Sequence, residues 1–546
     1  MFGLKDAYFY FIAFRISLIK FFKKIYFTSN RYNKSLLTKV PSQVYFNPNP
    51  FLLSIISPFK AHSFKVSEIN PNNFWLEKKS KKLMENHNFL WLNLINRKTD
   101  GKNIQKIIYL WMLKYFKFKR KIWDNSLIST RIISWILNSD IIINNGTFEF
   151  KKNFFQNIIS QSNHIKKNVK YENNPLTKIQ MFTALILSGL AFKEYEQNFN
   201  EAIGELEKFA KNYYDKDGFP MSRNPSDLIF LTKYLLLLSE SIKDSQRYLP
   251  EFLEDIIEKN LECIKIIKTP DEKIPLFNGG SENDLSPFEK YLENTGSKRR
   301  NKNIIGGLFH AKLKNQLIFL DVESPPSKNF SRNYQSGPLS FEYFLDGKKI
   351  VTNCGFGNNI SPKSELISRL TACQSTLTIN DTTINKFERS KLINKAFGNS
   401  IKNTFKTSSF NVRDDKEYIG CSITHNGYEK NFNCIHKREV YLDKKNNKLK
   451  GIDHIIKKSD GIPIRYVFRF HINPELTVIK TMSGNSALIQ LSKNKSLIFT
   501  ITEEKLEIEK SIFLGGKKIL DNSCITIAGN LVNKSKTFNW EIKKKL

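Results

Sequence analysis

The stretch LSFEYFLDGKKIV (339–351) shows the pattern that decides the fold of the second half of the chain. Apolar residues occupy every second position of its first seven residues, and Asp346-Gly347 then interrupts the pattern. A period of two is typical of a β-strand, and Asp-Gly is a common turn pair. The pattern recurs in LIFLDVE (317–323), STLTIN (375–380), YIGCSITH (418–425), REVYLD (438–443) and IRYVFRFHI (464–472). So many strands at this spacing predict an antiparallel β-sandwich rather than a parallel α/β fold.

Before Thr269-Pro270 the apolar residues recur instead at the spacing of an α-helix. Each of these segments suits a helix with at least one buried face. They are IQKIIYLWMLKYF (104–116), LISTRIISWIL (127–137), IQMFTALILSGLAF (179–192), DLIFLTKYLLLLSESI (227–242) and EFLEDIIEKNLECIKII (251–267). Short connections with breakers such as Asp217-Gly218 predict antiparallel helical hairpins packed side by side.

Length and composition agree with a large folded protein. The chain has 546 residues, 40% of them hydrophobic, and 86 Lys and Arg against 52 Asp and Glu give a net charge of +34. This composition predicts two to four domains and excludes wholesale disorder. The six cysteines form no CxxC pair, which argues against a zinc ribbon, a thioredoxin-type site and a dense disulfide framework, so we interpret them as buried hydrophobic residues.

The basic charge predicts a polyanionic partner, although an AT-rich coding sequence would also enrich the chain in Lys, Asn, Ile and Phe. No nucleic-acid-binding module is recognisable, so nucleic acid is not expected. Residues 1–30 are aromatic and basic but form neither a good signal peptide nor an apolar span of membrane length. An amphipathic helix docked on the helical half or lying on a membrane surface is predicted. We expect a cytoplasmic or inner-membrane-associated protein and leave the periplasm open.

Particular words at and around the junction carry a family resemblance. They are STRIISWI (129–136), DGFPMSRNP (217–225), IPLFNGGSEND (274–284), SGPLSFEYFLDGKKIVTNCG (336–355), RLTACQSTLTIND (369–381), THNGY (424–428) and IHKREVYL (435–442). Their order and spacing resemble the heparinase II/III family of bacterial polysaccharide lyases, in its alphaproteobacterial branch.

This resemblance implies an incomplete (α/α) toroid followed by an antiparallel β-sandwich, with an acidic polysaccharide in the cleft between them. On that basis we divide the chain into an aromatic, basic segment (1–60), a toroid (61–270), a linker (271–303) and a sandwich (304–546).

The resemblance also implies a lyase that performs β-elimination beside a uronate carboxylate, with a structural zinc in many members. In this chain the zinc positions hold Gln335, Asn353 and Gln374, and amide oxygens are poor zinc ligands. We therefore expect no metal and no other cofactor, and three amides that hydrogen-bond one another. The words that match the family's catalytic Asn and Tyr, NPLTKIQ (174–180) and RNPSD (223–227), do not keep those residues in register.

Three residues remain as candidates for proton transfer. His425 and His436 are the only histidines in family-like words, with His425 at a predicted hairpin turn and Arg438 on the same strand face as His436. His436 is the best candidate, although an isolated histidine is more often structural. Tyr334 could act as a base only if nearby arginines lowered its pKa.

Six residues are predicted to bind the glycan, and several have a structural interpretation beside the functional one. Arginines can hold a carboxylate or sulfate with two parallel hydrogen bonds. Asn224 also suits the N-cap of a helix that starts at Pro225, and Trp135 suits toroid packing as well as sugar stacking. The predicted substrate-binding residues are Arg131, Trp135, Arg223, Asn224, Arg332 and Arg369.

Two functions of different classes remain open from the sequence. The first is a heparinase II/III-like lyase that cleaves a uronate-containing glycan by metal-free β-elimination. The second is a non-catalytic acidic-glycan-binding or envelope-assembly protein that keeps the cleft but has lost the chemistry. Whether the chain is an enzyme and what its oligomeric state is are not decided by the sequence.

Overall fold

The chain forms two compact units in the computed structural model, which describes residues 4–58, 70–75, 86–144, 146–295, 302–458, 463–532 and 535–545. The helical unit comprises Met1–Tyr214 and Phe230–Asn260. The sandwich unit comprises Asp215–Ile229 and Leu261–Leu546, so it includes a short segment from the middle of the helical region. The four-part division expected from the sequence stays a prediction.

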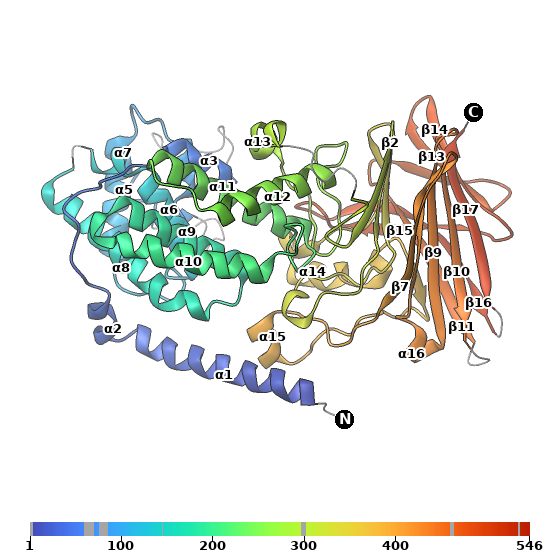
Figure 1. The fold of residues 1–546 in the computed structure, drawn as a ribbon, viewed down its shortest axis with the longest axis horizontal. Coiled ribbons are helices and arrows are strands. Elements are labelled where there is room, and N and C mark those ends of the chain that lie inside the picture. Colours follow the sequence, from blue (N-terminus) through green and yellow to red (C-terminus); the bar gives the residue numbers. More distant parts are fainter. Residues whose placement is uncertain are drawn as a thin grey trace. The chain divides into compact units, whose positions relative to one another are not determined.

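The helices of the first half are drawn in blue to green in Figure 1. All five segments predicted as helices are helical, and the last has the predicted bounds. The helices are α1 (Leu4–Phe27), α2 (Asn30–Ser35), α3 (Leu53–Ile56), α5 (Gly101–Tyr115), α6 (Asn125–Leu137), α7 (Ser139–Ile143), α8 (Phe148–Asn168), α9 (Pro175–Ala191), α10 (Glu196–Tyr213), α11 (Pro225–Asp244) and α12 (Glu251–Ile267). None of the described helices is both long enough and apolar enough to cross a membrane.

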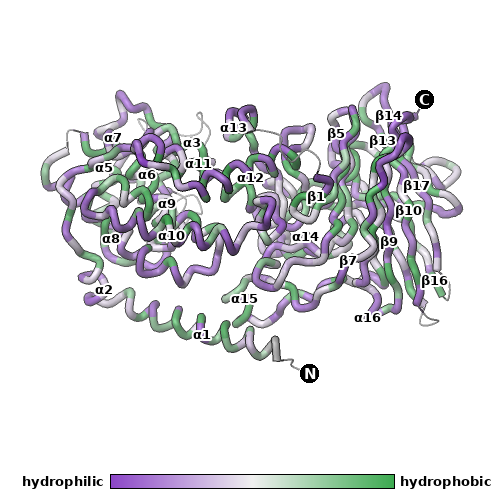
Figure 2. Tube along the Cα trace, in the orientation of Figure 1, coloured by the Kyte–Doolittle hydropathy of each residue, from purple (hydrophilic) through white to green (hydrophobic). Residues whose placement is uncertain are grey.

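Capping and burial explain the helix at the centre of this unit. Oδ1 of Asn174 accepts a hydrogen bond from the backbone nitrogen of Leu176, and Pro175 occupies the first helical position of α9. Every residue from Ile179 to Ala191 is buried, and α9 contacts α6, α8 and α10. Because α9 is surrounded by other helices, its sequence is apolar on all faces, as Figure 2 shows by colour.

The second half forms two antiparallel sheets, as predicted. Among the described residues, one sheet has the order β1-β2-β3-β4-β5-β11-β16-β15, with β6 also paired to β11, and the other has the order β12-β13-β14-β17-β10-β9-β8-β7. The strands are β1 (Ile304–Ile305), β2 (Leu308–Leu313), β3 (Gln316–Asp321), β4 (Phe341–Leu345), β5 (Lys348–Thr352), β6 (Leu377–Ile379), β7 (Thr407–Asp414), β8 (Tyr418–His425), β9 (Cys434–Asp443), β10 (Leu449–Lys457), β11 (Ile464–Ile472), β12 (Thr477–Lys480), β13 (Ser486–Ser492), β14 (Lys495–Ile501), β15 (Glu507–Phe513), β16 (Leu520–Leu531) and β17 (Lys536–Lys544).

The inner faces of the two sheets share one hydrophobic core. The ring of Trp540 on β17 lies 5.5 Å from that of Phe341 on β4 and 5.0 Å from that of Phe470 on β11. These contacts join residues of opposite sheets, so they fix the sheets face to face. All six cysteines are buried and free, in agreement with their interpretation as small hydrophobic residues.

Short helices interrupt the strands of the sandwich unit. The turn predicted at THNGY is present at Gly427 and Tyr428, within the connection between the antiparallel strands β8 and β9, and the short helix α16 (Glu429–Phe432) follows it directly. The hydroxyl of Tyr428 donates to the carbonyl of Leu377, and this long-range contact holds the connection against the other sheet. The other short helices of this unit are α13 (Glu289–Asn294), α14 (Pro362–Ser368) and α15 (Lys391–Phe397).

Candidate functional site

The start of α11 fixes the position of Arg223 in the sandwich unit. Oδ1 of Asn224 accepts from the backbone nitrogen of Ser226 at 2.9 Å, and its Nδ2 donates to Asp227 at 3.0 Å. The predicted N-cap is therefore confirmed. Arg223, one residue earlier, has a left-handed backbone with φ of 55°, which is uncommon for a residue with a side chain. This strained conformation aims the guanidinium away from α11 and toward β3.

The guanidinium of Arg223 lies in a buried polar cluster. Its Nη1 is 3.4 Å from Oδ1 of Asp321 and 4.0 Å from Oε2 of Glu323. Its Cζ lies 5.6 Å from the centre of the Tyr334 ring, within the range of a cation–π contact. Arg223, Asp321 and Tyr334 are each at least 94% buried, while the side chain of Glu323 is 55% exposed. The three buried side chains therefore lie just beneath the surface, beside the exposed side chain of Glu323.

Three donor atoms of this cluster have no hydrogen-bond partner among the described residues. They are Nε and Nη2 of Arg223 and Oη of Tyr334, and all are buried. Nε and Nη2 carry the two parallel N–H groups on the outer edge of a guanidinium, the edge that holds a carboxylate or sulfate. Buried donors are almost always paired in folded proteins, so these three mark a place suited to an acidic ligand.

Electrostatics assign different roles to the two partners of Arg223. Burial raises the pKa of Asp321 to about 6, and the neighbouring Arg223 opposes this shift. Asp321 is therefore ionised at neutral pH but close to its titration range. Burial, together with the charge of Asp321, raises the pKa of Tyr334. The condition under which Tyr334 could act as a base, a lowered pKa, is therefore not met, and its protonated hydroxyl can act as an acid but not as a base.

The three amides at the expected zinc positions bind backbone groups rather than one another. Nε2 of Gln335 donates to the carbonyls of Gly355 and Ser368, and Nε2 of Gln374 donates to the same Ser368 carbonyl at 2.9 Å. Oδ1 of Asn353 accepts from the backbone nitrogen of Ser375. The prediction of direct bonds between the amides is therefore wrong, although two of them converge on one carbonyl. The described residues contain no group of three or more His, Cys, Asp or Glu side chains that could hold a metal ion.

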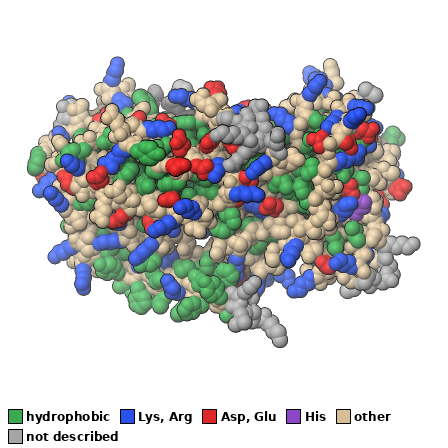
Figure 3. All heavy atoms as spheres, viewed as in Figure 1, with side chains coloured by type: hydrophobic (Ala, Val, Ile, Leu, Met, Phe, Trp, Pro, Cys, Tyr) green, Lys and Arg blue, Asp and Glu red, His purple; other side chains and the backbone are tan. Residues whose placement is uncertain are grey.

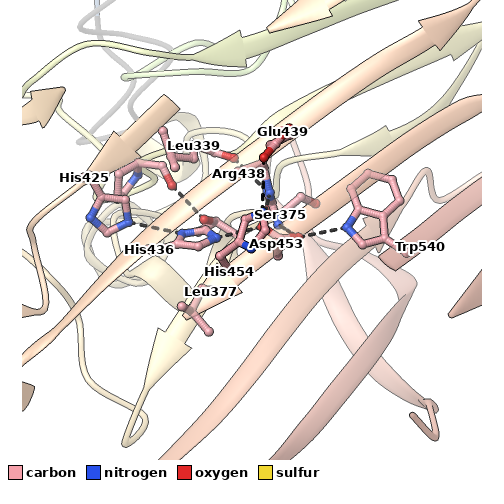
Figure 4. Close-up of polar contacts among 12 residues, drawn as sticks. Leu339, Ser375, Leu377, His425, His436, Arg438, Glu439, Asp453, His454 and Trp540 are labelled. Atoms are coloured by element: carbon pink, nitrogen blue, oxygen red, sulfur yellow. Dashed lines mark hydrogen bonds and ion pairs between the residues drawn. The ribbon is translucent and has the colours of Figure 1, made fainter. Parts of the chain in front are cut away.

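The two histidines predicted to transfer protons lie inside the sandwich, as Figure 4 shows. Nε2 of His425 is 3.3 Å from Nδ1 of His436, and Nε2 of His436 is 2.7 Å from Oδ1 of Asp453. Arg438 donates to both oxygens of Asp453, and Trp540 donates to Oδ2 at 2.8 Å. The histidines are completely buried. They cannot reach a glycan, so the structure assigns them to a core network rather than to catalysis.

The hydrogen bonds fix the tautomers of both histidines. The backbone nitrogen of Gly427 donates a hydrogen bond to Nδ1 of His425, so the proton of the His425 ring is on Nε2. This Nε2–H group donates a hydrogen bond to Nδ1 of His436. His436 then carries its proton on Nε2 and donates it to Asp453. Burial lowers the pKa of both histidines. The charge of Asp453 raises the pKa of His436, but the effect of burial is larger. Both rings are therefore neutral at physiological pH.

Two of the predicted glycan ligands belong to the helical unit. Arg131 is fully buried in the helical unit, where it donates to Gln161 and to the carbonyls of His87 and Ile122. Trp135 is also fully buried, so its packing interpretation holds and sugar stacking does not. Neither side chain can contact a glycan in this conformation.

The last two predicted ligands lie in the loops around Tyr334. The guanidinium of Arg369 is buried and donates to the carbonyls of Tyr334, Ser331 and Asn399. Arg369 therefore positions the loop that carries Tyr334, and it has no exposed surface of its own. Arg332 is exposed and remains a predicted ligand.

The sequence led to Arg223, Asn224 and Tyr334 but missed Asp321 and Glu323. Asp321 is the last residue of the buried strand β3 and Glu323 lies two residues after it, in a segment, LIFLDVE, that the sequence predicts only as a strand. A carboxylate at the end of a fully buried strand was the available signal, because a charged residue at such a position is rarely buried without a partner. Structure was needed to show that the partner is Arg223, 98 residues earlier in the chain.

The fold of the chain is that of the heparinases. A heparan sulfate lyase from Pedobacter heparinus, in a mutant form, superposes with a TM-score of 0.64, at 15% identity, over 94% of this chain and 87% of the lyase. A structure of heparinase III superposes with a TM-score of 0.65, at 14% identity, over 97% of this chain and 91% of that chain. These likenesses confirm the predicted helical toroid followed by an antiparallel β-sandwich.

Sequence comparison finds a match to a family model over part of the chain. Residues 306–541 match the family described as heparinase II/III-like, C-terminal. Residues 306–541 are thus similar in sequence to the heparinase II/III family, and the chain as a whole shares the fold of the heparinases. No curated protein matches the chain in sequence. The alphaproteobacterial branch stays a prediction.

Proposed function

We propose that this protein binds an acidic, uronate-containing glycan and that Arg223 holds one of its carboxylates or sulfates. The observation that supports this most directly is the unpaired outer edge of the guanidinium, formed by Nε and Nη2. An acidic group placed there receives two parallel charge-assisted hydrogen bonds in a site with little water. The net charge of +34 would draw a polyanion to the protein before the specific contact forms.

Nε and Nη2 of Arg223 are buried in this conformation, so a glycan can reach them only if the exposed side chain of Glu323 moves aside. The exposed carboxylate of Glu323 lies 4.0 Å from Nη1 and competes for the same positive charge. The buried carboxylate of Asp321 holds the opposite edge of the guanidinium, so it orients the fork without filling it. The inter-domain cleft expected for the polysaccharide stays a prediction.

Lyase chemistry is the second candidate function, and the position of Asp321 and Tyr334 beside Arg223 favours it. With Arg223 neutralising the uronate carboxylate, the ionised Asp321 would accept the proton from C5. The bond between C4 and the leaving oxygen would break, and the protonated Tyr334 would give its proton to that oxygen. Transfer of the proton from Asp321 to Tyr334 would then restore both residues. No step in this sequence requires a metal or a redox partner.

Calorimetry of the full chain on defined acidic oligosaccharides tests binding. Sulfated and unsulfated uronate oligosaccharides should bind, and a neutral dextran oligosaccharide of the same length should not. Arg223→Lys keeps the charge but loses the fork, so affinity should fall roughly ten- to a hundredfold. Glu323→Gln should bind several-fold more tightly, because it removes a competing carboxylate. Equal affinity of the Arg223→Lys variant and the parent would refute the site, and Arg413→Lys at an exposed arginine provides the control.

Turnover is tested separately by ultraviolet absorbance of the unsaturated uronate that β-elimination produces. A rise that disappears in Asp321→Asn and Tyr334→Phe would support elimination at this site. Binding that depends on Arg223 with no absorbance change on any uronate polymer would assign the chain to the non-catalytic class. A rise that survives both substitutions would contradict the mechanism.

A further inference from the structure

Helix α1 exposes a large apolar surface. The side chains that form it are aromatic or aliphatic and are between 44% and 65% exposed, which is unusual for so many neighbouring residues of this kind. They are Tyr8, Phe11, Phe14, Leu18, Phe21, Phe22, Ile25 and Tyr26. Figure 3 shows hydrophobic side chains gathered where α1 runs in Figure 1. This surface is a property of the helical unit and is independent of the Arg223 cluster.

The exposed residues share one face of the helix. Phe11, Phe14, Leu18, Phe22 and Ile25 follow one another at intervals of three or four residues, so they span an arc of about 80°. Tyr8, Phe21 and Tyr26 widen the same face on both sides. Ala13, on the opposite side of the helix, is fully buried. The helix thus packs on the protein with one side and presents an apolar stripe on the other.

Contacts at its carboxyl end hold α1 on the helical unit. Nζ of Lys23 donates to Oδ1 of Asn168 at 2.7 Å, at the end of α8. The ring of Phe27 lies 5.2 Å from the rings of Phe118 and His164. These residues point to the side of α1 that faces the unit, so the apolar stripe keeps its exposure while the helix is anchored.

The charges of α1 select the kind of partner. The helix contains five basic residues and one acidic residue, Asp6, and Arg15, Lys20 and Lys24 are exposed. A positively charged, aromatic-rich amphipathic helix fits the boundary between headgroups and acyl chains of an anionic bilayer. Tyrosines near both ends of the stripe suit the same boundary, where their hydroxyls remain hydrated.

We propose that α1 docks the protein on an anionic phospholipid surface, with the helix lying in the plane of the membrane. Phe11, Phe14, Leu18 and Phe22 enter the acyl boundary. Arg15, which lies within the widened apolar face, extends its guanidinium to the headgroups, while Lys20 and Lys24 lie on the polar side of the helix. The helix lies on the bilayer rather than across it, because basic residues interrupt its apolar stretch. Such docking would place the glycan-binding unit close to an envelope surface.

Flotation of the full chain with vesicles tests the proposal. Vesicles of phosphatidylcholine with phosphatidylglycerol should carry the protein at low salt, and phosphatidylcholine alone should carry less. Replacing Phe11, Phe14 and Phe22 together by Ser should weaken partitioning roughly a hundredfold, because three aromatic side chains no longer leave water. A control variant, Phe148→Ser with Tyr248→Ser, removes two still more exposed aromatic residues elsewhere in the helical unit and should partition as the parent does.

A second variant reports directly on insertion. In Phe14→Trp the new indole should show blue-shifted fluorescence with anionic vesicles and should be quenched by brominated acyl chains. Absence of flotation with anionic vesicles, or equal flotation of the parent and the triple Ser variant, would overturn the proposal. Light scattering could also show that the parent is a dimer and the triple Ser variant a monomer, with equal flotation of the two. That result would mean that the stripe binds a second copy of the chain, and it would overturn the proposal of membrane docking as well.

Discussion

Nε2 of His436 lies 2.7 Å from Oδ1 of Asp453, and both side chains are buried between the two sheets of the sandwich. Arg438 pairs with the same carboxylate and also donates through Nη1 to the carbonyls of Leu339 and Ser375. Those carbonyls lie in loops of the other sheet. The network therefore joins the sheets with charge-assisted hydrogen bonds and holds the loops beside Gln374.

Removal of the central carboxylate should destabilise the sandwich strongly. Asp453→Asn leaves Arg438 buried without an opposite charge, so the free energy of unfolding should fall by roughly 3–5 kcal/mol. Urea denaturation measures this change. Asp381→Asn breaks the exposed pair with Arg465 and should cost at most about 1 kcal/mol. Similar losses for both variants would contradict the role of Asp453.

Mild acid should destabilise the protein through its buried histidines. Burial lowers the pKa of His425, His436 and His471, the last to about 4, and that of His87 and His164 to about 3. Above pH 6.5 these histidines are neutral in both states. As pH falls below 6.5 the unfolded chain binds protons that the folded chain does not, so stability is lost by about 1.4 kcal/mol per pH unit for each histidine.

Urea midpoints measured between about pH 7.5 and about pH 4.5 check this dependence. Burial raises the pKa of Asp321 to about 6 and also raises the pKa of Asp215, so these two carboxylates work in the opposite direction over part of the range. They are outnumbered by the buried histidines, which include His310, whose pKa burial also lowers. Replacing the half-buried His454 by Gln provides a control that should keep the steep slope. Urea midpoints that do not change with pH would contradict the prediction, because they would mean that the folded protein binds protons at these histidines as readily as the unfolded chain does.

The regular parts of the fold follow from the sequence because their buried faces are apolar. The segments YIGCSITH and IRYVFRFHI have the bounds of β8 and β11, and EFLEDIIEKNLECIKII has those of α12. Helix α8 was not among the predicted segments, because its buried side includes Asn157, Gln161 and His164, and polar residues hide the helical period. Strand β7 was missed for another reason: it lies at a sheet edge, and nearly all of it is exposed.

The candidate site was only partly predictable. Arg223 and Asn224 stand out because a helix start leaves a recognisable cap, and that local signal is correct. The pairing of Arg223 with Asp321 depends on how the segment 215–229 packs on β3, and no local pattern encodes that contact. The histidines misled the prediction because a titratable residue in a family-like word has the same sequence signature whether it is accessible or buried.

Chelation should leave the protein unchanged. The amide nitrogens of Gln335 and Gln374 point at the Ser368 carbonyl, so this region presents donors where a zinc ion would need lone pairs. We expect the same thermal midpoint with and without EDTA, and far less than one zinc per chain by elemental analysis. A midpoint that falls in chelator and recovers with zinc would contradict this expectation, because structural zinc contributes substantially to folding.

Two glycines separate the effect of the Arg223 cluster from a general backbone effect. Gly307 and Gly347 have nearly equal positive φ values, 78° and 80°. A Cβ at Gly307 would lie 2.6 Å from Nη1 of Arg223, whereas a Cβ at Gly347 would meet nothing within 4 Å.

Each Ala substitution should lower the free energy of unfolding by roughly 1–2 kcal/mol, because both positions have a left-handed backbone. Only Gly307→Ala should also displace the guanidinium and weaken calorimetric binding of an acidic oligosaccharide by about tenfold or more. Equal binding by the two variants would mean that Arg223 does not hold the glycan.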